Sequence, residues 1–126
     1  MIDHITMKVS DYAKSKHFYT QALQPIGYKP AAEYNVEGRG ICGWAVGEKL
    51  DFWIVESATP TTHTHIALAA KNRSIVRAFY ENALKAGGKD NGPPGLRELY
   101  HPHYFGAFVL DPDGNNIEAV CHEAEG

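Results

Sequence analysis

The chain has 126 residues, of which 44% are hydrophobic and 21% are charged, as in ordinary globular proteins and unlike disordered chains or coiled coils. Its formal net charge is −3 and no apolar run approaches the roughly 20 residues of a membrane span, so we expect neither nucleic acid nor a membrane as a partner. The start lacks the pattern of a secretory signal, and Cys42 and Cys121 lack C-x-x-C spacing. These features predict a cytoplasmic protein.

The two halves of the chain repeat each other at a constant spacing of 61 residues. His65-Ile66 repeats His4-Ile5, Phe79-Tyr80 repeats Phe18-Tyr19, Ala83-Leu84 repeats Ala22-Leu23, and Gly88 repeats Gly27. Two copies are too few for a solenoid, which needs about three or more repeats to bury its faces. The pattern predicts one domain over residues 1–126, with a module over about 1–56, a connector over about 57–63 and a second module over about 64–122.

The first module is predicted to contain a strand, a helix and further strands, in that order. Residues 1–9 alternate apolar and polar side chains, as a half-buried strand does. Ser10 or Asp11 can cap the helix that follows, and Pro25 and Gly27 end it. Two β-type runs follow at 41–46 and 50–55, with a weaker candidate strand around 28–34.

The second module begins after a polar connector and repeats the strand and the helix. Asn72 or Ser74 can cap this second helix, and Gly87 supplies its left-handed terminator. Residues 89–103 are rich in glycine and proline and are predicted to form an irregular loop facing a ligand. Strands at 104–110 and 115–121 are predicted to form a hairpin around the turn Asp111-Pro112-Asp113-Gly114.

Three side chains that can bind a metal lie on the less apolar faces of predicted strands. His4 and His65 are equivalent residues of the repeat, and Glu118 is an isolated acid in an apolar strand. One histidine of this kind is usually a structural residue, but two at equivalent positions predict a shared cleft. Two imidazoles and one carboxylate suit a first-row divalent metal and leave coordination positions for water and substrate. One divalent metal, Fe, Zn, Ni, Mn or Co, is therefore the predicted cofactor.

Further side chains are candidates for the same cleft. Tyr104 and His101 are predicted to act as catalytic acid, base or hydrogen-bond donor, because they precede the hairpin that carries Glu118. The predicted substrate-binding residues are Trp53, Arg97 and His103, and Phe52 and Arg39 are weaker candidates for that role. His63 is a reserve candidate for metal ligation. The structural alternative is that the aromatic residues pack in the core and that the loop histidines and arginines are solvated.

The paired His-Ile strands, the capped helices with Phe-Tyr and the segment Phe-Val-Leu-Asp-Pro-Asp-Gly-Asn-Asn-Ile-Glu at 108–118 resemble the vicinal oxygen chelate superfamily. This superfamily includes glyoxalase I, extradiol dioxygenases and the fosfomycin and bleomycin resistance proteins. The resemblance implies an α+β fold of two β-α-β-β-β modules that form a cleft, with metal ligands on the first and last strands. It also implies a homodimer in which the partner subunit can complete the cleft around a small-molecule substrate.

The sequence departs from glyoxalase I at one position. Alignment of 50–55 with 115–120 puts Trp53 opposite Glu118, where glyoxalase I is expected to have a second acid, unless the register slips and Asp51 or Glu56 takes that place. Trp cannot ligate a metal, so the resemblance implies a glyoxalase-like lyase or isomerase, or a dioxygenase, acting on a small oxygen-rich substrate. The alternatives are a metal-free, bleomycin-resistance-like binding protein and a fosfomycin-type thiol transferase.

Overall fold

The computed structural model describes residues 1–124, so the last two residues of the predicted domain lie outside the described residues. The first half contains β1 (Ile5–Val9), α1 (Tyr12–Leu23), η1 (Gln24–Ile26), β2 (Lys29–Val36), β3 (Arg39–Val46) and β4 (Lys49–Glu56). The second half contains β5 (His65–Ala69), α2 (Arg73–Lys85), β6 (Lys89–Leu96), β7 (Phe105–Leu110) and β8 (Asn116–Cys121). None of the helices in the described part of the chain is long and apolar enough to span a membrane.

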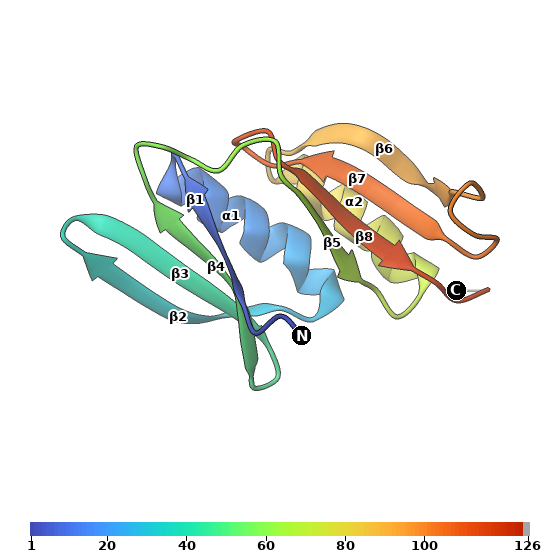
Figure 1. Ribbon diagram of the computed structural model, residues 1–126, viewed down its shortest axis with the longest axis horizontal. Coiled ribbons are helices and arrows are strands. Elements are labelled where there is room, and N and C mark those ends of the chain that lie inside the picture. The colour runs from blue at the N-terminus through green and yellow to red at the C-terminus, as the bar shows by residue number, and fades with distance from the viewer. Residues whose placement is uncertain (125–126) are drawn as a thin grey trace.

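Each half folds into a four-stranded mixed sheet with one helix packed against it (Figure 1). Sheet A has the strand order β1-β4-β3-β2, and sheet B has the order β5-β8-β7-β6. In both sheets the first strand of the half pairs parallel with its last strand, and the remaining pairs are antiparallel. The predicted α+β fold with two β-α-β-β-β modules is confirmed.

The structure corrects the predicted loop at 89–103. Residues 89–96 form β6, which pairs antiparallel with β7 although the pairing shifts register on either side of Gly92. β6 is the edge strand of sheet B and pairs with a neighbour on one side only. Pro93 and Pro94, which have no backbone N–H to donate, are therefore tolerated in it. The irregular loop is therefore limited to residues 97–104.

The helices begin and end where the sequence predicted. The side chains of Asp11 and Asn72 cap α1 and α2. Asp11 accepts a hydrogen bond from the backbone N–H of Lys14, and Asn72 accepts one from the backbone N–H of Ile75. Ser10 instead donates its hydroxyl to Asp113 of the second half at 2.5 Å. Gly27 and Gly87 both have positive φ, at 110° and 101°, which allows the chain to leave each helical segment through a left-handed turn.

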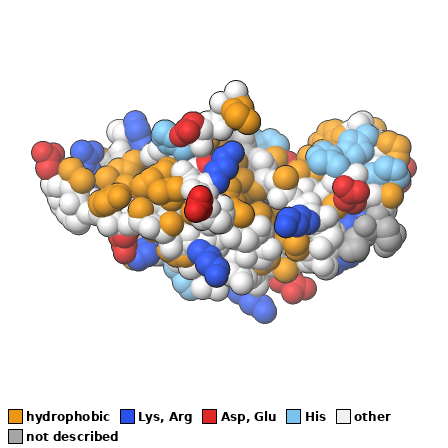
Figure 2. Space-filling model, turned by 90° about the horizontal axis from the view of Figure 1, so that it is seen from below, with side chains coloured by type: hydrophobic (Ala, Val, Ile, Leu, Met, Phe, Trp, Pro, Cys, Tyr) orange, Lys and Arg blue, Asp and Glu red, His pale blue; other side chains and the backbone are white. Residues whose placement is uncertain are grey.

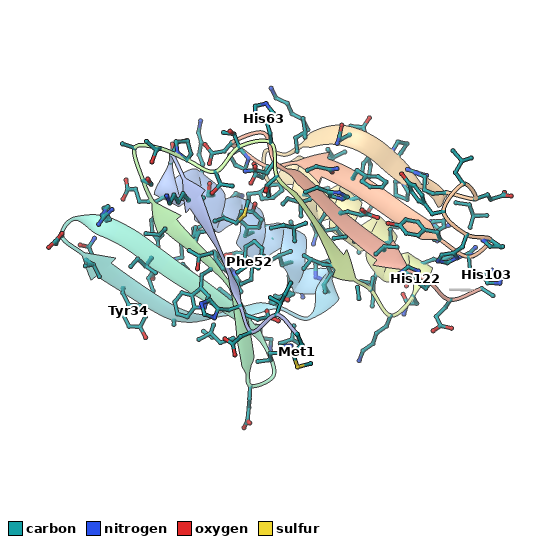
Figure 3. All side chains as sticks on the ribbon, viewed as in Figure 1. Met1, Tyr34, Phe52, His63, His103 and His122 are labelled. Atoms are coloured by element: carbon teal, nitrogen blue, oxygen red, sulfur yellow. The ribbon has the colours of Figure 1, made fainter. Side chains whose placement is uncertain are left out.

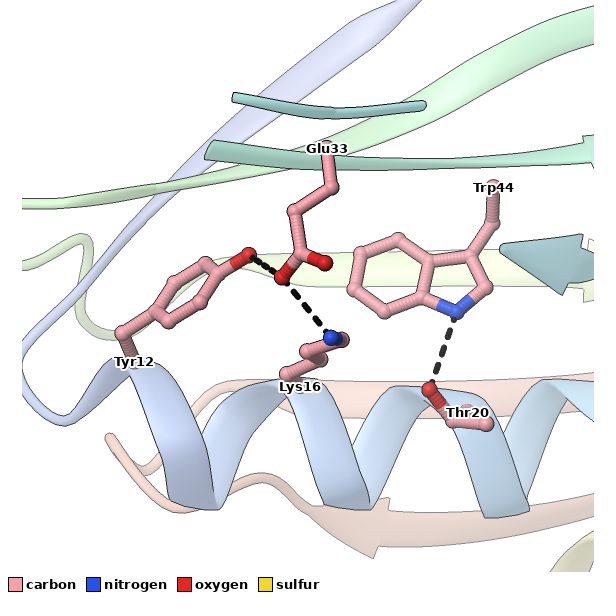
Figure 4. Close-up of polar contacts among 5 residues, drawn as sticks. All are labelled: Tyr12, Lys16, Thr20, Glu33 and Trp44. Atoms are coloured by element: carbon pink, nitrogen blue, oxygen red, sulfur yellow. Dashed lines mark hydrogen bonds and ion pairs between the residues drawn. The ribbon is translucent and has the colours of Figure 1, made fainter. Parts of the chain in front are cut away.

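Polar side chains attach α1 to sheet A (Figure 4). The Glu33 carboxylate on β2 accepts from the Tyr12 hydroxyl at 2.5 Å and from Lys16 Nζ at 2.7 Å. Deeper between the layers, Trp44 Nε1 donates to the Thr20 hydroxyl at 3.3 Å. Because β2 is an edge strand with almost every side chain exposed, these contacts tie a strand that contributes little to the core.

The two halves join through their helices. A single cluster of buried hydrophobic side chains contains residues of both halves, and α1 packs on α2. At this junction the buried Asp111 carboxylate accepts from the Tyr19 hydroxyl at 2.5 Å and from the backbone N–H groups of Asp113 and Asn115. The sheets therefore lie beside each other, and the faces turned away from the helices are open.

The junction predicts the effect of Tyr19→Phe on stability. The substitution leaves Asp111 buried with one donor fewer, which should lower the free energy of unfolding at pH 7 by about 1–3 kcal/mol in a denaturant titration. Burial, and then the Asp111 charge, raise the pKa of Tyr19 well above its usual value. The stabilisation that comes from this raised pKa is fully present below about pH 10, where tyrosine in the unfolded chain is still protonated, and is lost as the pH rises further. The free energy of unfolding should therefore fall less above pH 10 in Tyr19→Phe than in the wild type.

Tyr34→Phe is the matched control, because the Tyr34 side chain is exposed. Its free energy of unfolding should stay within about 0.5 kcal/mol of the wild type. Equal losses in the two variants would show that the Tyr19 hydroxyl adds nothing specific at the junction.

Candidate functional site

Glu118 is the acidic side chain around which the candidate site is built. It lies in the middle of β8, opposite Ala67 of β5 and Phe108 of β7, and only 1% of its surface is exposed. Side chains alternate along a strand, so Ile117 and Ala119 enter the core while Glu118 points to the open face of sheet B. A carboxylate buried at this depth requires hydrogen-bond donors or a cation.

His65 supplies one partner of that carboxylate. It is the first residue of β5 and pairs with Asn116, so it lies on the same open face as Glu118. Its Nε2 atom is 2.8 Å from Glu118 Oε1, and 53% of the His65 side chain is exposed. The pair thus has a buried acid and an imidazole that solvent or a ligand can reach.

Tyr104 supplies the second partner. Its hydroxyl donates to Glu118 Oε2 from the residue that directly precedes β7. Burial, followed by the hydrogen bond to Glu118, raises the pKa of Tyr104 above its usual value. We call His65, Tyr104 and Glu118 the Glu118 cluster.

The loop at 97–104 continues the site toward the end of sheet B. The backbone N–H of His103 donates to His101 Nδ1, so His101 Nε2 carries the proton and donates to His122 Nδ1 at 2.7 Å. Both imidazole rings contact the Tyr104 ring. Figure 2 shows histidine side chains gathered at this end of the molecule, and Figure 3 shows His122 and His103 there.

Arg97 borders the cluster and has no carboxylate partner among residues 1–124. Its guanidinium stacks 5.3 Å from the centre of the Phe108 ring and donates to the Pro93 carbonyl at 2.6 Å. Phe108 is the neighbour of Glu118 across β7 and β8, and its ring is also 6.2 Å from that of His65. Arg97 therefore lies one side chain away from the Glu118 cluster.

His4 lies in the other half, apart from this cluster. It precedes β1, is exposed, and places Nδ1 2.6 Å from Asp3. Within residues 1–124, no group of three or more His, Cys, Asp or Glu side chains is arranged to hold a metal ion. One chain therefore assembles two of the three predicted ligands, His65 and Glu118, and leaves His4 elsewhere.

Strand pairing confirms that Trp53 is the counterpart of Glu118. Trp53 pairs with Thr6, two residues after His4, just as Glu118 pairs with Ala67, two residues after His65. The alternative alignment, in which Asp51 or Glu56 would stand opposite Glu118, is therefore wrong. Both of these acids have other hydrogen-bond partners. Asp51 accepts from the Tyr28 hydroxyl, and Glu56 accepts from the backbone N–H of Gly40.

Sheet A carries aromatic side chains where sheet B carries ionisable ones. Trp53 is half-buried and stacks on Tyr34 of β2, with ring centres 6.3 Å apart and planes 12° apart. Figure 2 shows hydrophobic side chains gathered on this half of the molecule. Phe52, by contrast, is a core residue packed against Tyr19 and Trp44, and His63 is exposed in the connector.

Two members of the site region were absent from the sequence prediction, His122 and Tyr34. His122 follows β8 directly and meets His101 only because the loop at 97–104 folds back over the strand end. Tyr34 meets Trp53 across the intervening strand β3. Neither contact has a local sequence signal, because each joins segments far apart in the chain.

The donor set fits part of a metal site. An imidazole nitrogen and a carboxylate oxygen 2.8 Å apart are ligands that first-row divalent metals accept. The described residues place no Lys or Arg within ion-pair distance of Glu118, and positive charge from a metal would suit its buried carboxylate. His65 and Glu118 can thus hold a metal, with further ligands required from outside this cluster.

Comparison with known proteins defines the family. The Glyoxalase/Bleomycin resistance protein/Dioxygenase superfamily matches residues 1–119, and the chain belongs to this superfamily. A crystal structure of a glyoxalase/bleomycin resistance protein from Albidiferax ferrireducens T118 has 26% identity and a TM-score of 0.76, covering 95% of this chain and 97% of that one.

Two further solved structures share the fold at lower identity. A glyoxylase/bleomycin resistance protein/dioxygenase domain from Frankia sp. EAN1pec is 16% identical, with a TM-score of 0.74 and 98% coverage of both chains. Glyoxalase I from Zea mays is 22% identical with a TM-score of 0.73, covering 98% of this chain and 45% of the maize chain. Among curated proteins, none matches this chain.

The Glu118 cluster predicts the behaviour of Tyr104 at high pH. An ordinary tyrosine ionises near pH 10, but burial and the hydrogen bond to Glu118 should keep Tyr104 protonated there in metal-free protein. The ultraviolet difference between wild type and Tyr104→Phe should therefore show almost no phenolate absorbance at pH 10. A half-ionised tyrosine in that difference spectrum would contradict the contact with Glu118.

Proposed function

We propose that this protein is a divalent-metal-dependent enzyme that acts on a small oxygen-rich substrate, as a glyoxalase-like lyase or isomerase or as a dioxygenase. The observation that carries the proposal is the Glu118 cluster, in which a buried carboxylate and a reachable imidazole share the open face of sheet B. Glyoxalase I activity itself is not proposed, because Trp53 occupies the position equivalent to Glu118 in sheet A. A cytoplasmic location remains part of the proposal.

The metal would be held by His65 and Glu118 of one chain and by His4 of the partner subunit in a homodimer. Within one chain the helices join the halves, so the open faces of the two sheets lie side by side. A twofold dimer can bring sheet A of one chain over sheet B of the other, and its symmetry forms two equivalent sites. His4 then reaches a Glu118 cluster without any change of fold.

When bound, the metal supplies Lewis-acid activation of two neighbouring substrate oxygens. Glu118 would be a negatively charged ligand of the metal, and the hydrogen bond from Tyr104 fixes the orientation of its carboxylate. His101 and His122 contact the Tyr104 ring and limit its movement. Arg97 and His103, on the loop at 97–104, are the proposed contacts to an anionic part of the substrate.

A second candidate function is metal-free binding of a small aromatic molecule. The observation that favours it is the stacked pair Trp53 and Tyr34 on the open face of sheet A. Flat aromatic surfaces bind apolar rings by offset stacking and dispersion. In this function His65 and Glu118 form a structural hydrogen bond only.

Metal content separates these two functions. Protein purified without chelator or affinity metal should carry close to one equivalent of divalent metal per chain by elemental analysis, and His65→Ala and Glu118→Gln should each lose most of it. Iron would direct assays to oxygen-dependent cleavage, and Zn, Ni, Mn or Co to lyase and isomerase reactions.

His63→Asn is the control for this measurement, because His63 is exposed outside the Glu118 cluster and asparagine tolerates its positive φ of 59°. This variant should keep its metal. A wild-type protein that takes up no metal after addition would favour the metal-free function.

Mixing two variants that each bind little metal tests whether the metal site is shared between subunits. His4→Ala and His65→Ala should each bind little metal alone, but in a mixed dimer one of the two sites is intact. After subunit exchange by mild unfolding and refolding of an equal mixture, about a quarter of the wild-type metal content should return. No recovery, with mixed dimers shown by native mass spectrometry, would show that His4 acts within its own chain or not at all.

A further inference from the structure

A large cavity in the described part of the chain lies away from the Glu118 cluster. It has a volume of about 630 Å³ and is formed at the junction of the two halves by α1, the end of α2, the start of β6 and the turn between β7 and β8. Its lining side chains include Lys14, His17, Lys85, Lys89 and Asp111. A smaller hollow of about 250 Å³ shares His17 and Lys85 and continues the cavity between the two helices.

The lining of the cavity carries more positively than negatively charged side chains. Lys14, Lys85 and Lys89 are exposed at its walls, and none takes part in an ion pair within residues 1–124. The one acidic side chain in the lining, Asp111, is 5% exposed and already accepts from Tyr19 and from backbone donors. The lining therefore holds three lysines and one carboxylate, and that carboxylate already accepts several hydrogen bonds.

The helix ends at the cavity do not cancel this charge. Lys14 stands in the first turn of α1, where unpaired backbone N–H groups add partial positive charge. The last turn of α2 carries partial negative charge, and Lys85 lies in that turn. The two helix ends offset each other, so the excess of lysine charge remains.

We propose that this cavity binds a small molecule carrying two or more phosphate-type negative charges. Its volume lies in the range of small-molecule sites, roughly 300–1,000 Å³. The cationic groups in the lining are lysine ammonium ions, which bind phosphate as point charges. The imidazole of His17 adds a hydrogen-bond donor beside them.

Such a ligand would bridge the two halves of the chain. Lys14 and His17 come from the first half, whereas Lys85 and Lys89 come from the second. The site is separate from the proposed metal site, because none of the Glu118 cluster lines the cavity.

Calorimetric titration of the full chain with pyrophosphate in low salt tests the proposal. One saturable site per chain is expected, and the double variant Lys14→Ala/Lys85→Ala should weaken it by about tenfold or more, since it removes two of the three ammonium groups. The control is Lys29→Ala/Lys49→Ala, which removes the same charge from exposed positions outside the cavity and should change affinity by less than about twofold. Thermal unfolding of each variant checks that it is folded.

Any of the following results would overturn the proposal. The first is the absence of saturable pyrophosphate binding, and the second is an equal loss in both double variants, which would mean that only net charge matters. The third is citrate binding as tightly as pyrophosphate, which would assign the cavity to carboxylates. Glu118→Gln should bind pyrophosphate like the wild type, and a loss there would place the anion at the Glu118 cluster instead.

Discussion

In both halves of this protein, the first strand pairs parallel with the last strand, and the rest of the structure depends on the register of that pairing. Side chains alternate along a strand, so a shift of one residue would exchange the buried and open faces. The observed register places Glu118 two residues along from His65 on the open face of sheet B. The same register in sheet A places Trp53 at the equivalent point after His4. The same strand register thus places an ionisable pair on the open face of one half and an aromatic surface on that of the other.

The junction between the halves decides what a single chain can assemble. The buried Asp111 carboxylate, with its donor from Tyr19, lies where α1 and α2 meet, and the shared hydrophobic core continues around it. Joining the halves through helices leaves both open sheet faces beside each other (Figure 1). The proposed homodimer would combine the unequal halves of two chains, since His4 lies in the first half and the His65–Glu118 pair in the second.

Charge is distributed unevenly between the two sides of the molecule. On the open face of sheet B, the buried Glu118 carboxylate contacts Tyr104 and His65, and residues 1–124 place no lysine or arginine within ion-pair distance of it. At the helix junction, lysines surround a cavity whose one acid is already satisfied by hydrogen bonds. The first arrangement suits a cation and the second suits an anion, and their separation allows both to be occupied in one chain.

The sequence by itself determined the duplication, the two modules and the equivalence of Trp53 with Glu118, because repeats and alternation are local patterns. It also placed the cap of each helix to within two candidates, and the structure selected Asp11 and Asn72. It also predicted His65, Tyr104 and Glu118 as site residues, although it could not show that they form one cluster. It missed β6, because proline and glycine oppose strand structure except at a sheet edge, and edges are defined only by the assembled sheet. Only the tertiary structure separated His4 from Glu118 and joined Lys14 to Lys85, since such placements depend on how two halves pack rather than on any neighbouring residues.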